Sequence, residues 1–162
     1  MRGMTESSGR VASLQVVPGN HATAEYRDVV TAAPGKGIDG DWHFHRGDRA
    51  VLLIDRGDLG DLELAPGDLR EQITLELDGL MSLPAGTRLR LGQVTLELTK
   101  VCEPCTHIGE HVGVDDVESF RDRLQGRRGM LARVTSVEGR GRIRVGDRVE
   151  VERPVAAPPA MG

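Results

Sequence analysis

The segment VTLELTKV, Val94–Val101, indicates the fold of this chain most clearly. Its apolar residues Val94, Leu96 and Leu98 alternate with threonine and glutamate residues. Successive side chains of a β-strand point to opposite faces of a sheet. The pattern therefore predicts a strand with one buried face and one polar face.

Six other short runs show a similar alternation, and turns that contain glycine or proline separate them. They cover residues 11–17, 49–55, 72–77, 87–92, 130–137 and 143–151. Seven short strands connected in this way predict a mainly β chain, folded as a closed or nearly closed barrel or as a sandwich.

One clear α-helix is expected near residues 115–125, in the segment DDVESFRDRLQG. Val117, Phe120 and Leu124 recur there at the spacing of one helical face. A weaker helical turn is expected within residues 55–64.

The length of 162 residues is typical of one domain with a core large enough to fold without disulfide or metal cross-links. Residues 1–10 and 153–162 lack any hydrophobic period, and we expect both segments to be disordered. Residues 11–152 are expected to form the domain.

Composition argues against several classes of partner. A net charge of −4 and only four Phe, Tyr or Trp residues speak against nucleic-acid binding. No apolar run approaches the roughly 20 residues of a membrane span, and the first residues lack the apolar core of a secretory signal. We expect a cytoplasmic protein, without a nucleic-acid or membrane partner, that binds a small ligand.

Both cysteines of the chain lie in the segment KVCEPCTHIGEH, Lys100–His111. The spacing of Cys102 and Cys105 supplies one half of a zinc site, but a second pair of ligands is missing. It also matches a redox motif, although THIGEHVG predicts a poor helix and the neighbouring pattern is not βαβ. Two small apolar side chains at a strand end are a further interpretation.

The remaining interpretation is a single reactive thiol at the mouth of the barrel. Pro104 marks the end of the strand and presents Cys105, whereas Cys102 continues the apolar alternation and is expected to be buried. A thiolate in such a position can ligate a soft metal or carry a sulfur atom. We expect Cys105 to meet two other polar segments, GIDGDWHFHRGDR and APGDLREQ, at one concave site.

The order of these motifs resembles the MOSC domain, the family found at the C-terminus of molybdenum cofactor sulfurases and as small bacterial proteins. The resemblance extends from about residue 11 to 151. It rests on Gly40-Asp41 with His43, VLLID, PGDLREQIT, LRLGQVTLELTKVCEPC, GRRGMLARV and IRVGDRVEV. It implies a single barrel-like closed sheet and makes Cys105 the functional thiol, a ligand of molybdenum or a carrier of persulfide sulfur.

The resemblance also implies binding of the molybdenum cofactor, a molybdopterin that carries a phosphate. The residues expected to contact it are Asp41, His43, Arg70, Glu71, Gln72, Arg127 and Arg128. The chain departs from the family pattern at Trp42 and Glu103, where arginine is common, and at Gln72, where asparagine is common. Guanidinium groups are good phosphate ligands, so the two missing arginines remove two of the anion contacts that the family pattern implies.

Three functions remain open at this stage. The first is cofactor binding with sulfur transfer, which requires a separate cysteine desulfurase because we expect no pyridoxal phosphate on this chain, and a molybdoenzyme as acceptor. The second is molybdenum-dependent reduction of N-hydroxylated compounds with electrons from a partner protein. The third is a zinc-binding or redox Cys-x-x-Cys module.

Overall fold

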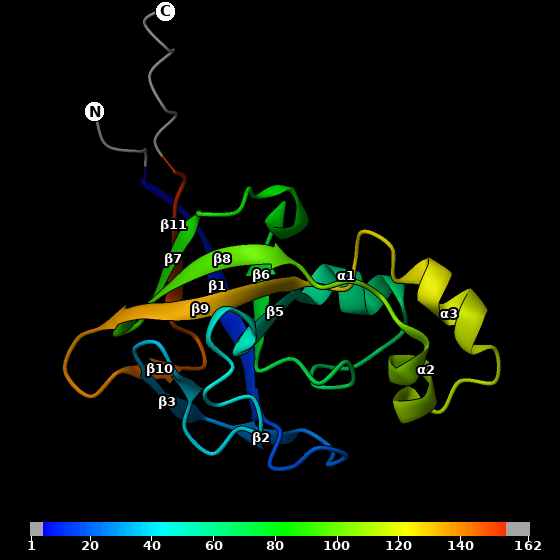
Figure 1. Ribbon diagram of the computed structural model, residues 1–162. Helices are drawn as coiled ribbons and strands as arrows, with labels where there is room; N and C mark the ends of the chain where they lie inside the picture. Colours follow the sequence, from blue (N-terminus) through cyan, green and yellow to red (C-terminus); the bar gives the residue numbers. More distant parts are fainter. Residues whose placement is uncertain (1–4, 155–162) are drawn as a thin grey trace, which may run out of the picture.

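A closed barrel of seven strands forms the centre of the computed structural model, which describes residues 5–154 (Figure 1). In chain order these strands are β1 (Thr5–Val16), β5 (Val51–Asp55), β6 (Ile73–Leu77), β7 (Arg88–Leu91), β8 (Val94–Val101), β9 (Met130–Val137) and β11 (Arg148–Glu152). Around the barrel they follow the order β11-β7-β8-β9-β5-β6-β1, and β1 pairs with β11 to close it. The prediction of a mainly β, barrel-like closed sheet is confirmed.

The interior of the barrel is filled with aliphatic side chains. Val94, Leu96 and Leu98 of β8 are each at most 1 % exposed and belong to this core, so the predicted alternation is confirmed. Burial of this apolar surface is the main force that holds the barrel together.

Strand β5 is buried on both faces. Val51 and Leu53 point into the barrel core, whereas Leu52 and Ile54 belong to a second hydrophobic cluster. That cluster lies on the outer side of β5 and β9, where helices α1 (Arg56–Asp61), α2 (Thr106–Val112) and α3 (Val117–Arg123) cover the sheet (Figure 1).

One neighbouring strand pair of the barrel is parallel, namely β5 with β6. Parallel neighbours require a crossover connection, and here it runs through α1 and the turns at residues 62–72. The Asp55 side chain starts α1 by accepting from the Gly57 N–H at 3.0 Å, and it also accepts from the Leu77 N–H at 2.8 Å. The crossover brings residues 69–72 to the same outer face as the helices.

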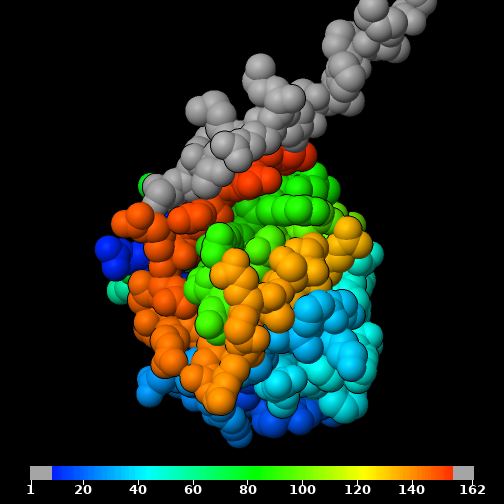
Figure 2. Space-filling model, turned by 90° about the vertical axis from the view of Figure 1, so that its left-hand side faces the viewer, coloured from blue at the N-terminus to red at the C-terminus, as the bar shows by residue number. Residues whose placement is uncertain are grey.

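Shorter elements extend this frame. Strand β2 (Glu25–Arg27) pairs with β1, and β3 (Val29–Ala33), β4 (Gly37–Ile38) and β10 (Arg142–Arg144) form a small antiparallel sheet. Two 3-10 turns, η1 (Gly47–Arg49) and η2 (Leu80–Ser82), complete the described elements. Figure 2 shows the side away from α2 and α3, where the β9–β10 region in orange lies against residues near 30–50 in blue and cyan.

The N-terminal prediction was wrong from residue 5 onward. We expected residues 1–10 to be disordered, but β1 begins at Thr5 and pairs with β11, Thr5 opposite Glu152 and Arg10 opposite Arg148. This pairing is made by backbone hydrogen bonds, which a polar segment supplies as well as an apolar one. Of the predicted C-terminal tail, Arg153 and Pro154 follow β11 without regular structure, and residues 155–162 lie outside the described part.

The predicted strand at 143–151 is divided into β10 and β11 by a turn at Gly146, which has a φ of 91°. The two strands join different sheets, because β10 pairs with β3 while β11 pairs with β7 and β1. The helix expected near 115–125 is confirmed as α3, and its N-cap Asp116 accepts from the Ser119 N–H at 3.0 Å. The weaker turn expected within 55–64 corresponds to α1.

The prediction that THIGEHVG makes a poor helix was wrong, since α2 occupies Thr106–Val112. Gly109 lies inside α2, where glycine costs about 1 kcal/mol relative to alanine. A Cβ at this position would lie 3.2 Å from side-chain atoms of Val114 and Val117. The close approach of the following segment and of α3 therefore explains why a glycine-containing segment is helical here.

Among the described residues, no helix combines the length and apolarity needed to cross a bilayer.

Candidate functional site

A cavity of about 540 Å³ lies on the outer face of β5 and β9, between the sheet and α2. Its apolar wall comes from the second hydrophobic cluster and consists of Leu52, Leu69, Ile108 and Leu131. The polar walls come from the loop at 42–49, the turn at 70–72 and the segment 102–111. The site is thus on the flank of the barrel, not in its filled interior, because alternation along β5 turns Leu52 outward.

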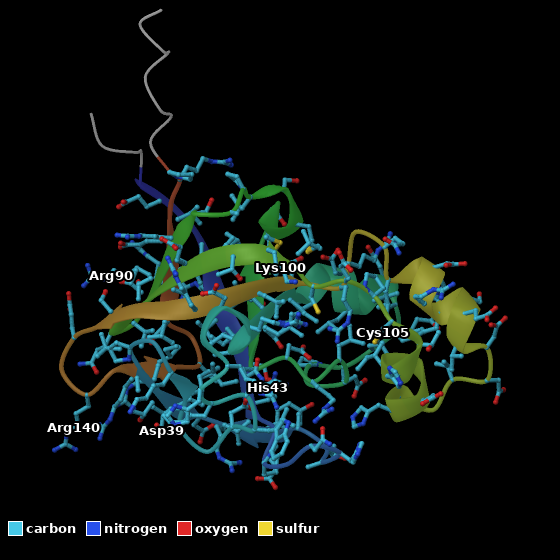
Figure 3. The ribbon with its side chains drawn as sticks, in the orientation of Figure 1. Asp39, His43, Arg90, Lys100, Cys105 and Arg140 are labelled. Carbon is cyan, nitrogen blue, oxygen red and sulfur yellow. The ribbon has the colours of Figure 1, made fainter. Side chains whose placement is uncertain are left out.

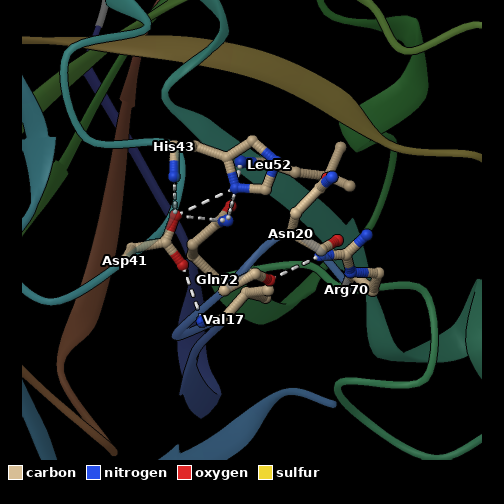
Figure 4. A network of polar contacts seen from close by, with 8 residues as sticks. Val17, Asn20, Asp41, His43, Leu52, Arg70 and Gln72 are labelled. Carbon is tan, nitrogen blue, oxygen red and sulfur yellow. Dashed lines mark hydrogen bonds and ion pairs between the residues drawn. The ribbon is translucent and has the colours of Figure 1, made fainter. Parts of the chain in front are cut away.

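Asp41 organises the loop on one side of this cavity (Figure 4). Its side chain is fully buried, and its Oδ1 accepts from the Val17 N–H at 2.7 Å. Oδ2 accepts from the His43 N–H at 2.8 Å and from Gln72 Nε2 at 3.1 Å, and it lies 3.0 Å from His43 Nδ1. Gln72 Oε1 in turn accepts from the Leu52 N–H at 2.7 Å. One carboxylate thereby joins the loop to β1 and, through Gln72, to β5 and β6.

The same contacts decide the protonation of Asp41. Burial alone would raise the pKa of Asp41, but the hydrogen bond with the His43 side chain and those from the Val17 and His43 N–H groups outweigh it. The pKa of Asp41 is held below its ordinary value of 3.8. The group is a carboxylate near neutral pH and accepts a hydrogen bond from His43 Nδ1–H. His43 Nε2 then remains as the free acceptor of a ring that lines the cavity.

Two arginines in the cavity wall have guanidinium atoms without partners. Arg128 is 8 % exposed, and its Nε and Nη1 are buried without a hydrogen bond. Arg70 donates through Nη2 to the carbonyls of Gly19 and Asn20, but its buried Nε is also unpaired. A buried charge without a partner is costly. The arrangement is therefore suited to an anion.

The electrostatic surroundings support this conclusion. Burial and the charge of Arg128 lower the pKa of Arg70, while Asp41 acts in the opposite direction. Arg46 and Arg49 add two further guanidinium groups to the wall, and none of the described residues that line the cavity is Asp or Glu. In a chain with a net charge of −4, this is a local concentration of positive charge.

The cysteine segment forms the opposite wall. Cys105 is exposed and occupies the N-cap position of α2, while Cys102 is half-buried against the second hydrophobic cluster. Both line the cavity. Strand β8 has an irregular register between Leu98 and Lys100, so Cys102 does not point into the barrel core with Leu98 as strict alternation would require.

Two histidines of α2, His107 and His111, also reach the cavity. Burial and the charge of Arg70 lower the pKa of His111. Figure 3 shows Cys105 beside α2 and His43 nearer the β3–β10 sheet, whereas Arg90 and Arg140 lie at the other end of the molecule.

The structure brings together most of the residues that the sequence suggested. His43, Arg70, Gln72 and Cys105, from the three segments expected to meet, line one cavity together with Arg128, and Asp41 lies directly behind His43.

Two other residues suggested by the sequence lie outside the lining. Glu71 is fully buried beneath the cavity wall, where it accepts from the Thr74 hydroxyl at 2.9 Å and burial raises its pKa. Arg127 is half-buried, and its Nε lies 3.6 Å from a carboxylate oxygen of Asp61. Neither is placed to contact a ligand in the cavity.

Sequence reasoning missed Asn20, Arg46, Arg49 and His111. The signal for Arg46 and Arg49 was their place in the loop that also carries His43.

Within residues 5–154, no group of three or more His, Cys, Asp or Glu side chains is arranged to hold a metal ion.

Comparison with known families decides the relationship of the chain. The family model of the MOSC domain matches residues 39–150. The chain belongs to the MOSC domain family. This family is associated with binding of the molybdenum cofactor.

Solved structures give the same fold for this MOSC domain. YuaD from Bacillus subtilis superposes with a TM-score of 0.77 at 20 % identity, over 93 % of this chain and 97 % of that one. YiiM from Geobacillus stearothermophilus gives 0.68 at 15 % identity over 88 % and 74 % of the two chains. YiiM from Escherichia coli gives 0.64 at 17 % identity over 91 % and 72 %. No curated protein is significantly similar in sequence.

Proposed function

We propose that this MOSC domain binds the molybdenum cofactor in the cavity on the outer face of β5 and β9, with the Cys105 thiolate as ligand of the metal or as carrier of a sulfur atom. One observation supports this above all others. The unpaired guanidinium of Arg128, beside Arg70, lines the same cavity as the exposed Cys105 thiol.

The donor set suits each part of this cofactor. A phosphate requires charged N–H donors, which Arg128 and Arg70 provide in a buried position. A pterin edge requires neutral hydrogen-bonding groups, and His43 Nε2 is one such acceptor. Molybdenum prefers soft sulfur ligands, and Cys105 supplies an exposed one.

Other residues support these contacts without making them. Asp41 and Gln72 use their polar atoms on each other, on His43 and on backbone N–H groups, so they position the loop and fix the His43 tautomer. Leu52, Leu69 and Ile108 exclude water from one wall. When bound, the cofactor supplies a metal centre for sulfur transfer or for two-electron reduction.

The first test is the cofactor content of protein made in a host that synthesises the cofactor. We expect molybdenum and pterin in equal amounts in the wild type and little of either in Cys105→Ser. Cys102→Ser is the matched control, because this half-buried thiol is only three residues away, and it should retain the cofactor. Equal cofactor content in Cys105→Ser and wild type, or zinc in place of molybdenum, would contradict the proposal.

The two chemical uses of the site give different results in activity assays. Sulfur carriage predicts a persulfide on Cys105 after incubation with a cysteine desulfurase and cysteine. Reduction predicts turnover of an N-hydroxylated compound with an external electron donor. Alkylation adds a structural check, since a thiol reagent at neutral pH should modify exposed Cys105 before Cys102, and bound cofactor should protect it.

A further inference from the structure

The mouth of the cavity carries an aromatic side chain that the functions above do not use. Trp42 is the one tryptophan of the chain, lines the cavity and is 43 % exposed. Large aromatic side chains usually bury most of their surface. An exposed indole at a cavity mouth, in a chain with so few aromatic residues, calls for an explanation.

Two arginines flank this indole. The guanidinium carbon of Arg46 lies 5.9 Å from the centre of the Trp42 ring, a cation–π arrangement. Arg49 lines the same cavity. Among the interactions of the described residues, neither arginine makes a side-chain hydrogen bond or an ion pair. Their N–H donors are therefore available to a ligand.

Backbone hydrogen bonds fix the loop that carries these three residues. The Trp42 N–H donates to the Val17 carbonyl at 2.6 Å, and the Arg46 N–H donates to the His43 carbonyl at 2.9 Å. The Arg49 N–H donates to the Arg46 carbonyl at 3.2 Å. Because the neighbouring Asp41 carboxylate is anchored by four contacts, the loop does not have to be ordered when a ligand binds.

We propose that the cavity mouth is a second subsite that binds a nucleotide, with its base stacked on Trp42 and its phosphate bound by Arg46 and Arg49. An indole face accepts any planar base, and guanidinium groups prefer phosphate. A phosphate without a ring would leave Trp42 unused, and a nucleoside would leave both arginines unused. The nucleotide is either a separate ligand or one half of a dinucleotide cofactor, and only the second case rests on the proposed cofactor binding.

This subsite is distinct from the inner pair of arginines. Arg70 and Arg128 have buried, unpaired nitrogen atoms, whereas Trp42, Arg46 and Arg49 lie on the loop around η1, and Trp42 and Arg49 are exposed. Because the two sets differ in burial, we assign a separate anionic group to each. A nucleic-acid polymer is disfavoured by the net charge of −4 and by the small number of aromatic residues, four in the whole chain.

Tryptophan fluorescence tests the proposal directly, because the emission comes from Trp42 alone. Cofactor-free protein is titrated with AMP, GMP and CMP, and in parallel with the corresponding nucleosides and with inorganic phosphate. We expect saturable quenching by at least one nucleotide. The matching nucleoside and phosphate should each require at least about tenfold higher concentrations.

Variants then separate the two contributions. Arg49→Ala should weaken nucleotide binding about tenfold, and Trp42→Ala, followed by calorimetry, should weaken it by a similar factor, as expected for loss of one stacked base. Arg56→Ala is the control, because Arg56 is exposed and pairs with Glu76 away from the cavity. It should bind as the wild type does.

The outcomes are distinct. No quenching, equal quenching by phosphate and nucleotide, or unchanged binding in Arg49→Ala would each overturn the subsite. These results do not depend on molybdenum retention, because the titration uses cofactor-free protein. Nucleotide released by acid from loaded protein, in equal amount to the pterin, would support a dinucleotide ligand. Saturable quenching without any nucleotide released from the loaded protein would support a separate nucleotide ligand.

Discussion

The two faces of strand β5 differ in what they contribute. The inner face, with Val51 and Leu53, belongs to the barrel core, which is closed and aliphatic. The outer face, with Leu52 and Ile54, belongs to the cluster beneath the helices, where a cavity of about 540 Å³ contains unpaired arginines. Adjacent residues of one strand thus serve stability and ligand binding separately.

This difference explains how the fold carries a polar site without loss of its core. Aliphatic side chains fill the interior of the barrel, so its packing does not have to accommodate a ligand. The helices and the loop at 41–49 provide the binding space on the outside, and Arg128 lines that outer cavity and is not part of the barrel core.

The largest expected effect comes from the inner face. Leu53→Ala removes a fully buried side chain from the barrel core and should lower the free energy of unfolding by about 2–5 kcal/mol, measured by chemical denaturation. Leu52→Ala is the matched control, because it alters the next residue of the same strand but only enlarges an existing cavity. A greater loss in Leu52→Ala than in Leu53→Ala would contradict the division between the faces.

An intermediate effect is expected from Asp41→Asn. The amide cannot accept from all the N–H donors around the buried carboxylate, so the variant should be about 1–3 kcal/mol less stable at pH 7. Because the folded pKa of Asp41 lies below its ordinary value of 3.8, the carboxylate stabilises the protein fully above that pH. The stabilisation disappears as the pH falls through the folded pKa.

Unfolding measured between pH 7 and pH 3 checks this expectation. The difference between wild type and Asp41→Asn should be constant at neutral pH and should narrow below about pH 4. Asp39→Asn is the control, since Asp39 is exposed on the same loop, and it should change stability by less than about 0.5 kcal/mol. A difference that does not vary with pH would show that the charge of Asp41 is not the cause.

The smallest effect is expected at Arg128, and its sign is opposite. Arg128→Met replaces a buried, unpaired charge by an apolar side chain of similar length, so the ligand-free protein should be about 1 kcal/mol more stable. The variant should also lose the cofactor. Arg127→Met is the control, because Arg127 lies outside the cavity lining beside the carboxylate of Asp61, and the stability of this variant should change by less than about 0.5 kcal/mol. Strong destabilisation by Arg128→Met would mean that a buried group such as Glu71 compensates the charge.

The sequence predicted the fold best where alternation was strict. Strand β8 has the expected bounds, 94–101, because residue type marks both of its faces. Strand β9 also has the expected bounds, 130–137, although its first three residues are apolar and buried on both faces. Strand β3, VVTAA, has no such alternation, and β4 has only two residues, so neither could be recognised. Helix α2 was not predicted, because helix propensity alone argues against a helix that contains Gly109. The close packing of neighbouring side chains, which the sequence does not reveal, favours glycine at this position.

The site could be predicted as a set of segments but not as a set of contacts. Polar loops next to strand ends pointed to His43 and Cys105. The hydrogen bond between Gln72 and Asp41 joins residues 31 positions apart, and no local sequence pattern predicts it. Arg46 looks like an ordinary surface arginine in the sequence, and no local pattern separates the buried Arg128 from its neighbour Arg127, because only the fold shows which arginines lack an acidic neighbour.

The pairing of β1 with β11 has a consequence for how the protein acquires its structure. This ladder joins residues 5–10 to residues 148–152, nearly the whole length of the chain, and such distant contacts make folding slow, in the range of milliseconds to seconds. During synthesis β1 is made first but cannot form its ladder with β11 until β11 has been made, although β11 contributes no residue to the cavity. The ligand-binding face is complete in sequence some 20 residues before the sheet that supports it can close.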